Sequence, residues 1–345
     1  MAGSIEPSKK DMKLLFELDF NYRQPYSRIG RKIRMSQQLI SYKVKSFSDE
    51  GVIIGAYPLI DYARLGYMSF RVYFKINYVN REKFQEMLDH MAKHPNITTI
   101  IECDGRYDLM CVFTARNPSS FNKKLRELVA AHPEQLKNFI ILTTVVEHHY
   151  SRNYLGIAER SDAIIGGDRE LIKLDEKDKK LLRAVHEGKK GIVEMARAAD
   201  IAPQTAITKL KELERALVVK GYRLHVNPRK IGFARNRMLI RLQDISVQRE
   251  NELRDFCKQH QNITEFIKTF GAWDLEIMME TRTREEFRNL YITIREKFQD
   301  IIDDFDNFRI FRVHKKSTMP EEFFQQEAKP KEKAPPKASP SAARG

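Results

Sequence analysis

The sequence predicts an α+β protein that contains one unit twice: a winged helix-turn-helix followed by a ferredoxin-like βαββαβ domain. The first observation is an internal repeat at an offset of 166 residues, which registers Leu65-Gly66-Tyr67 with Ile231-Gly232-Phe233. The second is a Gly-x-aromatic-Asp-Leu turn in both copies, at 105–109 and 271–275. The third is that helical periodicity gives way to strand periodicity in each copy. This period is too long for a solenoid, so the chain is a tandem duplication with its own pseudo-two-fold partner.

Each unit opens with a predicted helix that begins at a capping box. Ser8 and Asp175 are each followed three residues later by an aspartate, Asp11 and Asp178, which can reach back to the helix start. A second short helix is expected at 26–34 and 192–199. Two β-like runs, 51–60 and 217–226, each with a turn glycine, predict a wing hairpin that completes the motif.

The third helix of each unit, at about 36–47 and 202–213, is the expected DNA-recognition helix. Amides near its start can bond base edges, and basic side chains farther along can meet phosphates. An alternative is that these side chains only solvate a helix face, but the same pattern occurs in both copies. The predicted DNA-contacting residues are Arg28, Arg31, Lys32, Arg34, Gln37, Gln38, Ser41, Tyr42, Lys43 and Lys45 in the first copy, and Gln204, Thr205, Thr208, Lys209 and Lys211 in the second.

The second half of each unit reads β-α-β-β-α-β. Alternating apolar residues predict a half-buried strand around Phe70–Ile76, repeated around Met238–Leu242. Amphipathic helices and three further strands follow in both copies, which is the split arrangement with helices on one sheet face. The other face is left to bury against a partner sheet, and the second copy can supply one.

Composition favours an anionic partner. The 345 residues carry a net charge of +14, and no stretch approaches the roughly 18 apolar residues of a membrane span. The three cysteines fit neither a disulfide framework nor a metal site, which is typical of a reducing, cytoplasmic setting. We therefore expect a cytoplasmic protein with double-stranded DNA as its partner and no membrane association.

These motifs resemble the Lrp/AsnC family of feast-or-famine transcription regulators. The second copy carries the resemblance best, in Leu174-Asp175-Glu176 and in the run Asn227-Pro228-Arg229-Lys230-Ile231-Gly232. The resemblance implies a transcription regulator whose effector domain binds a small molecule, often an amino acid. Ordinary members carry one unit per chain and dimerise, so this chain resembles a fused pseudo-dimer, and further assembly into a homo-oligomer is compatible with it. The first copy departs from the pattern at its opening residues, 8–10.

The repeated turn has two readings. In the family it lies near the subunit interface where effectors bind, which makes it a candidate effector-binding or interface site. Its glycines can equally supply only positive φ, while the aspartates bond the turn backbone. The residues concerned are Gly105, Tyr107, Asp108, Gly271, Trp273 and Asp274.

Two other classes of function stay open. Sirohaem decarboxylases resemble Lrp/AsnC proteins and also occur as fused pairs, but their His-Asn-Tyr-x-Arg-like signature is absent from both copies. The other alternative is an effector-binding assembly module that no longer binds DNA. We expect no enzyme: the sequence shows no catalytic constellation, metal-ligand spacing or cofactor motif, and His148, His149 and His314 are interpreted as surface histidines.

The expected domain boundaries follow from these motifs. A linker that includes a short helix joins the units, and the Lys/Pro/Ala-rich end is expected to be disordered. The predicted segments are 8–62 and 174–228 for the helix-turn-helix domains, 66–150 and 232–316 for the effector domains, 151–173 for the linker and 318–345 for the tail.

Overall fold

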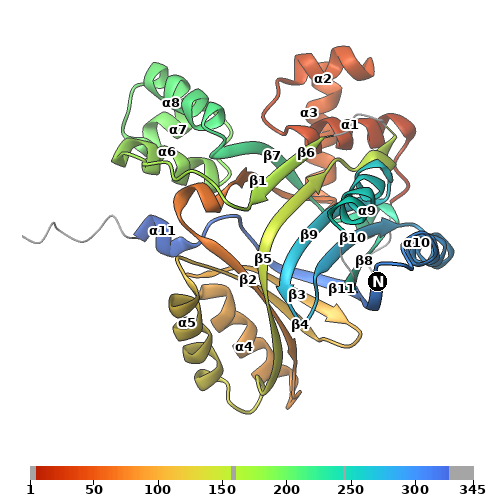
Figure 1. The fold of residues 1–345 in the computed structure, drawn as a ribbon. Helices are drawn as coiled ribbons and strands as arrows, with labels where there is room; N and C mark the ends of the chain where they lie inside the picture. The colour runs from red at the N-terminus through yellow and green to blue at the C-terminus, as the bar shows by residue number, and fades with distance from the viewer. Residues whose placement is uncertain (1–4, 157–160, 244–245, 326–345) are drawn as a thin grey trace, which may run out of the picture.

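The computed structural model describes residues 5–156, 161–243 and 246–325. Two helical heads stand on a β-barrel body that carries helices on its outer side (Figure 1). The predicted α+β class, with its duplicated unit, is confirmed. We call the parts of the chain before and after the connecting segment the first and second units.

The first head begins with the predicted capping box, in which Asp11 N donates to Ser8 Oγ at 3.2 Å and the Asp11 carboxylate accepts from Ser8 N. The second head repeats this with Asp175 and Asp178. The helices of the two heads are α1 (Lys9–Phe20), α2 (Tyr26–Ile33) and α3 (Gln37–Asp49), and then α6 (Glu176–His186), α7 (Ile192–Ala199) and α8 (Pro203–Arg215).

The wings differ from the expected hairpins. Each head contributes one strand, β1 (Ile53–Ile60) or β7 (Val219–Val226), and these two strands pair with each other in an antiparallel two-stranded sheet. The strand of one head therefore takes its hydrogen bonds from the other head. A shared sheet joins the two heads above the barrel (Figure 1).

The barrel is built from both units. Its strands are ordered β2-β4-β3-β11-β8-β10-β9-β5, and β2 pairs with β5 to close the ring. The bounds are β2 (Met68–Lys75), β3 (Ile97–Asp104), β4 (Leu109–Ala115), β5 (Asn138–Tyr150), β8 (Ala234–Leu242), β9 (Ile263–Gly271), β10 (Leu275–Thr281) and β11 (Ile302–Lys316).

The long strands β5 and β11 join the two halves. The first part of β5 pairs with β2 of its own unit, and its later part pairs with β9 of the other unit. Strand β11 does the same with β8 and then β3. Closure removes the unpaired strand edges that an open sheet would leave. The expectation that the second copy supplies the partner sheet is confirmed.

Helices cover the outer faces of the barrel. In the first unit, α4 (Arg81–Lys93) and α5 (Pro118–Ala131) enclose one apolar core; in the second, α9 (Val247–Gln259) and α10 (Arg284–Lys297) enclose another. A third apolar cluster fills the barrel interior, where Tyr73, Tyr107 and Trp273 lie.

The connecting segment and the C-terminal end are more structured than predicted. The connection contains a 3-10 turn, η2 (Asn153–Leu155), and a short strand, β6 (Asp162–Gly166), that pairs with β5. The predicted disorder from 318 onward is wrong for the first part of that segment, because a helix, α11 (Glu321–Gln325), packs there with Phe323 and Phe324 buried. The rest of that predicted tail, 326–345, lies outside the described residues. No helix in the described ranges is long and apolar enough to cross a membrane.

Candidate functional site

The predicted recognition helices, α3 and α8, present exposed polar faces on both heads. On α3 the exposed residues include Gln37, Gln38, Leu39, Ser41, Tyr42 and Lys45; on α8 they include Gln204, Thr205, Thr208, Lys211 and the acidic Glu212. Helix α3 starts at Ser36, whose side chain accepts from Leu39 N, and α8 starts with Pro203 in its first turn, a favoured helix position. A helix that is capped in this way can place its first turn at a base edge.

Three of the predicted DNA-contacting lysines have partners within the protein. The Lys43 ammonium lies 3.2 Å from Asp11, and Lys209 lies 2.8 Å from both Asp175 and Asp178. In both heads, then, this lysine ties the recognition helix to the capping box of the first helix. Lys32 pairs with Glu17 at 2.9 Å.

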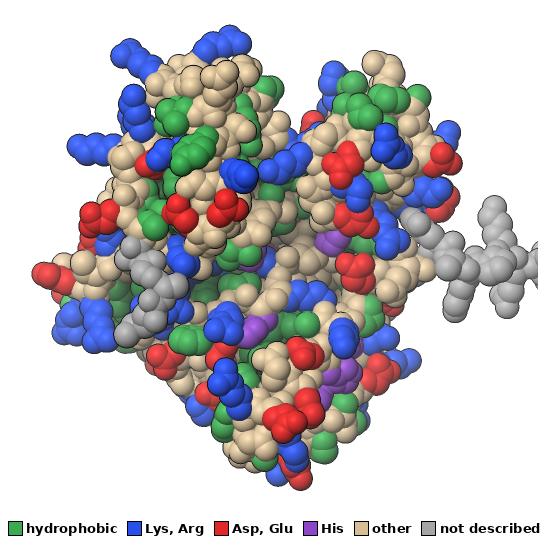
Figure 2. Space-filling model, turned by 180° about the vertical axis from the view of Figure 1, so that it is seen from behind, with side chains coloured by type: hydrophobic (Ala, Val, Ile, Leu, Met, Phe, Trp, Pro, Cys, Tyr) green, Lys and Arg blue, Asp and Glu red, His purple; other side chains and the backbone are tan. Residues whose placement is uncertain are grey.

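The remaining basic residues of the first head are exposed. Arg28, Arg31 and Arg34 lie on or just after α2, and the structure describes no ion pair for them. Their counterparts in the second head, at the same offset, are Glu194, Arg197 and Asp200. Figure 2 shows Lys and Arg side chains around the outer end of the first head, the left lobe in that view, and more acidic side chains on the second. The first head therefore has the stronger electrostatic attraction for a phosphate backbone.

The repeated turns lie at the junction of the two units. Tyr107 and Trp273 are buried in the barrel interior. Asp108 accepts a hydrogen bond from Ile76 N at 2.7 Å, and Asp274 accepts one from Leu242 N at 2.8 Å.

Both turn glycines have positive φ, +152° for Gly105 and +144° for Gly271. A Cβ on Gly105 would lie 2.9 Å from Phe308 Cβ, and one on Gly271 would lie 2.6 Å from Ile141 O. In each case the nearby atom belongs to the other unit. The packing of the two units at this junction therefore explains why both turns carry a glycine.

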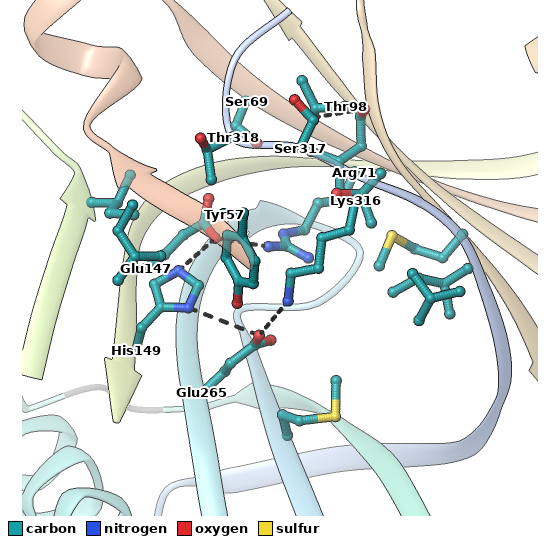
Figure 3. Close-up of a pocket in the computed structure, with 18 of the residues that line it drawn as sticks. Tyr57, Ser69, Arg71, Thr98, Glu147, His149, Glu265, Lys316, Ser317 and Thr318 are labelled. Carbon is teal, nitrogen blue, oxygen red and sulfur yellow. Dashed lines mark hydrogen bonds and ion pairs between the residues drawn. The ribbon is translucent and has the colours of Figure 1, made fainter. Parts of the chain in front are cut away.

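A buried cavity, which we call the chamber, lies between the wing strand β1 and the mouth of the barrel (Figure 3). It offers about 90 Å³, room for several water molecules or a compact solute. The strands of both units supply its walls, and the segment after β11 closes one side. Its polar and charged lining residues are Tyr57, Tyr62, Ser69, Arg71, Thr98, Thr99, Thr114, Glu147, His149, Arg152, Arg235, Arg237, Glu265, Glu280, Lys316, Ser317 and Thr318.

The charges in the chamber pair across the two units. Arg71 of the first unit bonds Glu147 and Glu276, both at 3.2 Å, and Arg237 of the second unit also contacts Glu276. Burial raises the pKa of Glu147, but the Arg71 guanidinium and His149 lower it by more than burial raises it. The resulting pKa is about 2. The His149 ring lies 3.4 Å from Glu147 and 3.8 Å from Glu265, and Lys316 lies 3.8 Å from Glu265.

The chamber is connected to both heads. Arg152 bonds Glu280 at 3.0 Å and, on its other side, Asp19 of α1 at 2.7 Å. Burial raises the pKa of Glu280, but Arg152 and Arg235 outweigh that effect and bring it to about 2. Asp19 and Glu280, the two partners of Arg152, are almost fully buried. A shift of Arg152 would therefore change its contact with Asp19 in the first head.

The second head is reached through the C-terminal segment. Thr318 lines the chamber, and α11 follows directly. Phe324 packs on His186 of α6 with ring centroids 4.9 Å apart, and Phe323 packs edge-on against Tyr67 of the first unit.

Sequence reasoning missed the chamber residues. Ser69 and Arg71 alternate with apolar residues in β2 and were expected on the polar side of a half-buried strand, yet both are almost fully buried and line the chamber. The usable signal was a charged residue inside an otherwise apolar run, as at Glu276 between Leu275 and Ile277. His148 is likewise no surface residue: it is buried and bonds Asp162 at 3.0 Å.

Comparison with known proteins gives a family match for part of the first unit. Residues 71–150 match the family described as Lrp/AsnC ligand binding domain. The chain is also similar to HTH-type transcriptional regulators. It is 26% identical over 119 residues to regulator Ptr1 of Methanocaldococcus jannaschii, covering 34% of this chain and 79% of that protein. It is 26% identical over 136 residues to regulator FL11 of Pyrococcus horikoshii, covering 39% and 88%.

Solved structures of a sirohaem decarboxylase match over nearly the whole chain. The sirohaem decarboxylase NirDL has a TM-score of 0.59 and 14% identity, covering 92% of this chain and 97% of that one. At this identity the likeness shows a shared fold. Residues 71–150 are therefore similar to an Lrp/AsnC ligand binding domain, the overall fold is like that of NirDL, and the curated relatives in sequence are named as transcription regulators.

Proposed function

We propose that this protein is a sequence-specific regulator of transcription that binds double-stranded DNA as an intramolecular pseudo-dimer. The observation that carries the proposal is the pair of exposed polar helix faces, on α3 and α8, held together by the β1–β7 sheet. A pair of recognition helices suits two half-sites about one helical turn apart. The regulator names of its sequence relatives support the same function.

We further propose that the chamber is the effector site. It is compact, lies directly beneath the wing strands and contacts the first head through Arg152. A small molecule with both donor and acceptor groups, such as an amino acid, matches its mixed charges. The turn residues Tyr107 and Trp273 would then support the site from the barrel interior without lining it.

The first test is selection of bound genomic fragments by the full chain, followed by binding to the best fragment across a salt series. We expect an enriched motif and an affinity that falls steeply with salt, because phosphate contacts release counterions. Weak binding without an enriched motif would exclude the regulator function. Titration of the complex with amino acids then tests the effector.

The second candidate is a tetrapyrrole enzyme, and the full-length likeness to NirDL is the observation in its favour. The chamber favours the regulator instead. A polycarboxylated macrocycle needs unpaired cations and a large space, whereas Arg71, Arg152 and Arg237 already bond glutamates inside about 90 Å³. A shift of the Soret band on titration with an iron uroporphyrin would revive the enzyme function.

The third candidate is an assembly module without DNA binding. The acidic residues of the second head, Glu194 and Asp200, are the observation that keeps it open for that head. Fragment selection with the full chain tests this candidate: a module without DNA binding enriches nothing, and an enriched motif with a single half-site would leave the second head without a DNA-binding role.

A further inference from the structure

A second cleft lies on the outer side of the barrel. None of its lining residues belongs to the predicted recognition helices α3 and α8. It is formed by the first half of α10 and by strands β8 and β11, and it offers about 560 Å³, within the usual range of ligand pockets. Among its lining residues four are arginines and Asp104 is the only acid; we call it the arginine cleft. Its arginines are Arg282, Arg284, Arg288 and Arg309.

The first unit shows why this cleft exists. Strand β2 pairs Phe70 with Thr143 of β5, and at the same register β8 pairs Asn236 with Arg309 of β11. In the first unit the Phe70 ring fills the space and stacks on Phe121, with centroids 4.2 Å apart and planes within 3°. In the second unit the stacking partner is replaced by a small amide, and the space beside Phe287, the counterpart of Phe121, opens into the cleft.

The internal repeat thus supplies a template for the occupant. A planar ring fits against Phe287 as the Phe70 ring fits against Phe121, because offset or parallel stacking is a favoured aromatic geometry. Polar groups surround the position that the ring would take. Asn236 and Asn307 line the cleft, and so does Thr281, which is 1% exposed and whose Oγ1 has no hydrogen-bond partner among the described residues.

The charges at the rim point to an anionic group on the same ligand. Arg284, Arg288 and Arg309 form no ion pair in the described part of the chain, whereas Arg282 lies over the Phe233 ring at 4.8 Å. In the first unit, the counterparts of Arg284, Arg288 and Arg309 are Pro118, Asn122 and Thr143. Both the opening and the positive charge of these three positions are therefore specific to the second unit. Three unpaired guanidinium groups suit a phosphate chain better than a single carboxylate, because each can bond phosphate oxygens bidentately.

We propose that the arginine cleft binds a nucleotide, with the base stacked on Phe287 and the phosphates held by Arg284, Arg288 and Arg309. Asn236, Asn307 and Thr281 would bond the edge of the base. This site is separate from the recognition helices and from the chamber. It does not depend on the proposed DNA-binding function, so each can fail without the other.

Equilibrium dialysis of the full chain against ADP, GDP, CDP and UDP tests the proposal. We expect saturable binding of at least one nucleoside diphosphate, and binding at least tenfold weaker for its nucleoside and for pyrophosphate, which each lack half of the contacts. No saturable binding up to millimolar concentration would overturn it, as would binding of pyrophosphate equal to that of the nucleotide.

Variants that introduce first-unit features into the second unit locate the site. Asn236→Phe should fill the cleft, and Arg288→Asn should remove one cation from the exposed face of α10; each should weaken nucleotide binding at least tenfold. The matched control is Arg254→Asn on α9, which should leave binding unchanged. Because Arg288 is exposed, its variant stays informative if Asn236→Phe fails to fold. Unchanged binding by Arg288→Asn, or an effect only on DNA affinity, would contradict the proposal.

Discussion

At the scale of single residues, two lysines on α3 illustrate how side chains two positions apart differ in role. Lys45 is exposed, whereas Lys43 lies 3.2 Å from Asp11. We expect Lys45→Gln to lower the slope of log affinity against log salt by about 1, because one phosphate contact is lost. Lys43→Gln is the matched control and should leave that slope unchanged. Salt titrations of the selected fragment measure both; equal slope changes would place Lys43 on the DNA.

Glu276 joins two buried arginines of the barrel, one from each unit. It is fully buried between Arg71 and Arg237, and its counterpart in the first unit is Met110. Glu276→Met leaves two buried guanidinium groups short of a partner, so we expect the free energy of unfolding to fall by about 3–5 kcal/mol. Urea unfolding of the variant and the parent chain gives this value.

A second substitution separates charge from packing. In the Glu276→Met background, Arg71→Met should recover part of the lost stability, because it removes one of the uncompensated charges. Glu285→Met, at an exposed position on α10, is the control and should change stability little. A double variant less stable than Glu276→Met alone would show that packing, not charge, dominates here.

Two histidines make the fold sensitive to mild acid. Burial, with nearby cations, lowers the pKa of His225 to about 3 and that of His94 to about 4. In the unfolded chain each binds a proton near pH 6.5, so stability is complete above that pH and falls as pH drops through 6.5 toward these values. Carboxylates with lowered pKa, such as Glu147, add their own loss only below about pH 4.5.

His225→Phe should therefore flatten the dependence of stability on pH between about 7 and 5. The expected change is at most about 1.4 kcal/mol per pH unit, the value for one proton. Val247→Phe, at a position 76% exposed, is the control, because it adds the same ring without removing a titratable group. Urea unfolding at several pH values measures the slope, and an unchanged slope in His225→Phe would refute the assignment.

At the scale of elements, the features that depend on local sequence pattern were predicted correctly from the sequence. The capping boxes start α1 and α6, and the apolar periodicity of the recognition helices appears as buried Ile40 and Phe47. Pairings between distant segments, such as β1 with β7, could not be predicted, because the residue pattern of a strand does not specify which other strand it pairs with. The charged pairs of the chamber escaped prediction for the same reason: Arg71 and Glu276 are 205 residues apart. The division into domains and the DNA-contacting residues stay predictions.

Helix α11 is the element whose role is easiest to isolate. Phe324 is 1% exposed and packs on His186 of α6, while the preceding Thr318 lines the chamber. Phe324→Ala should weaken docking by about 3 kcal/mol, typical of a buried Phe→Ala change. We expect amide hydrogen exchange in α11 and α6 to be at least tenfold faster. Val247→Ala, at a position 76% exposed, is the control; unchanged exchange in α6 would show that α11 does not hold the second head.

At the scale of the whole molecule, the shared β1–β7 sheet sets the distance between the two recognition helices. Heads on independent tethers would accept half-sites moved apart by a full turn of DNA, because the same face of the duplex is presented again. Heads joined by a common sheet would not, since their separation is fixed by strand pairing over 53–60 and 219–226. Under the proposed function, the joined heads make operator spacing a property of the protein fold.

The test is to insert base pairs between the half-sites of the selected operator. Insertions of about 5 and about 10 base pairs, half a turn and a full turn, should both reduce binding to the level of a single half-site. Insertions of the same lengths outside the operator are the controls and should have no effect. Recovery of affinity with the full-turn insertion would mean that the heads separate in solution and that the β1–β7 pairing opens on DNA. Exchange of the two half-sites would then show whether the basic first head and the less basic second head prefer different sequences.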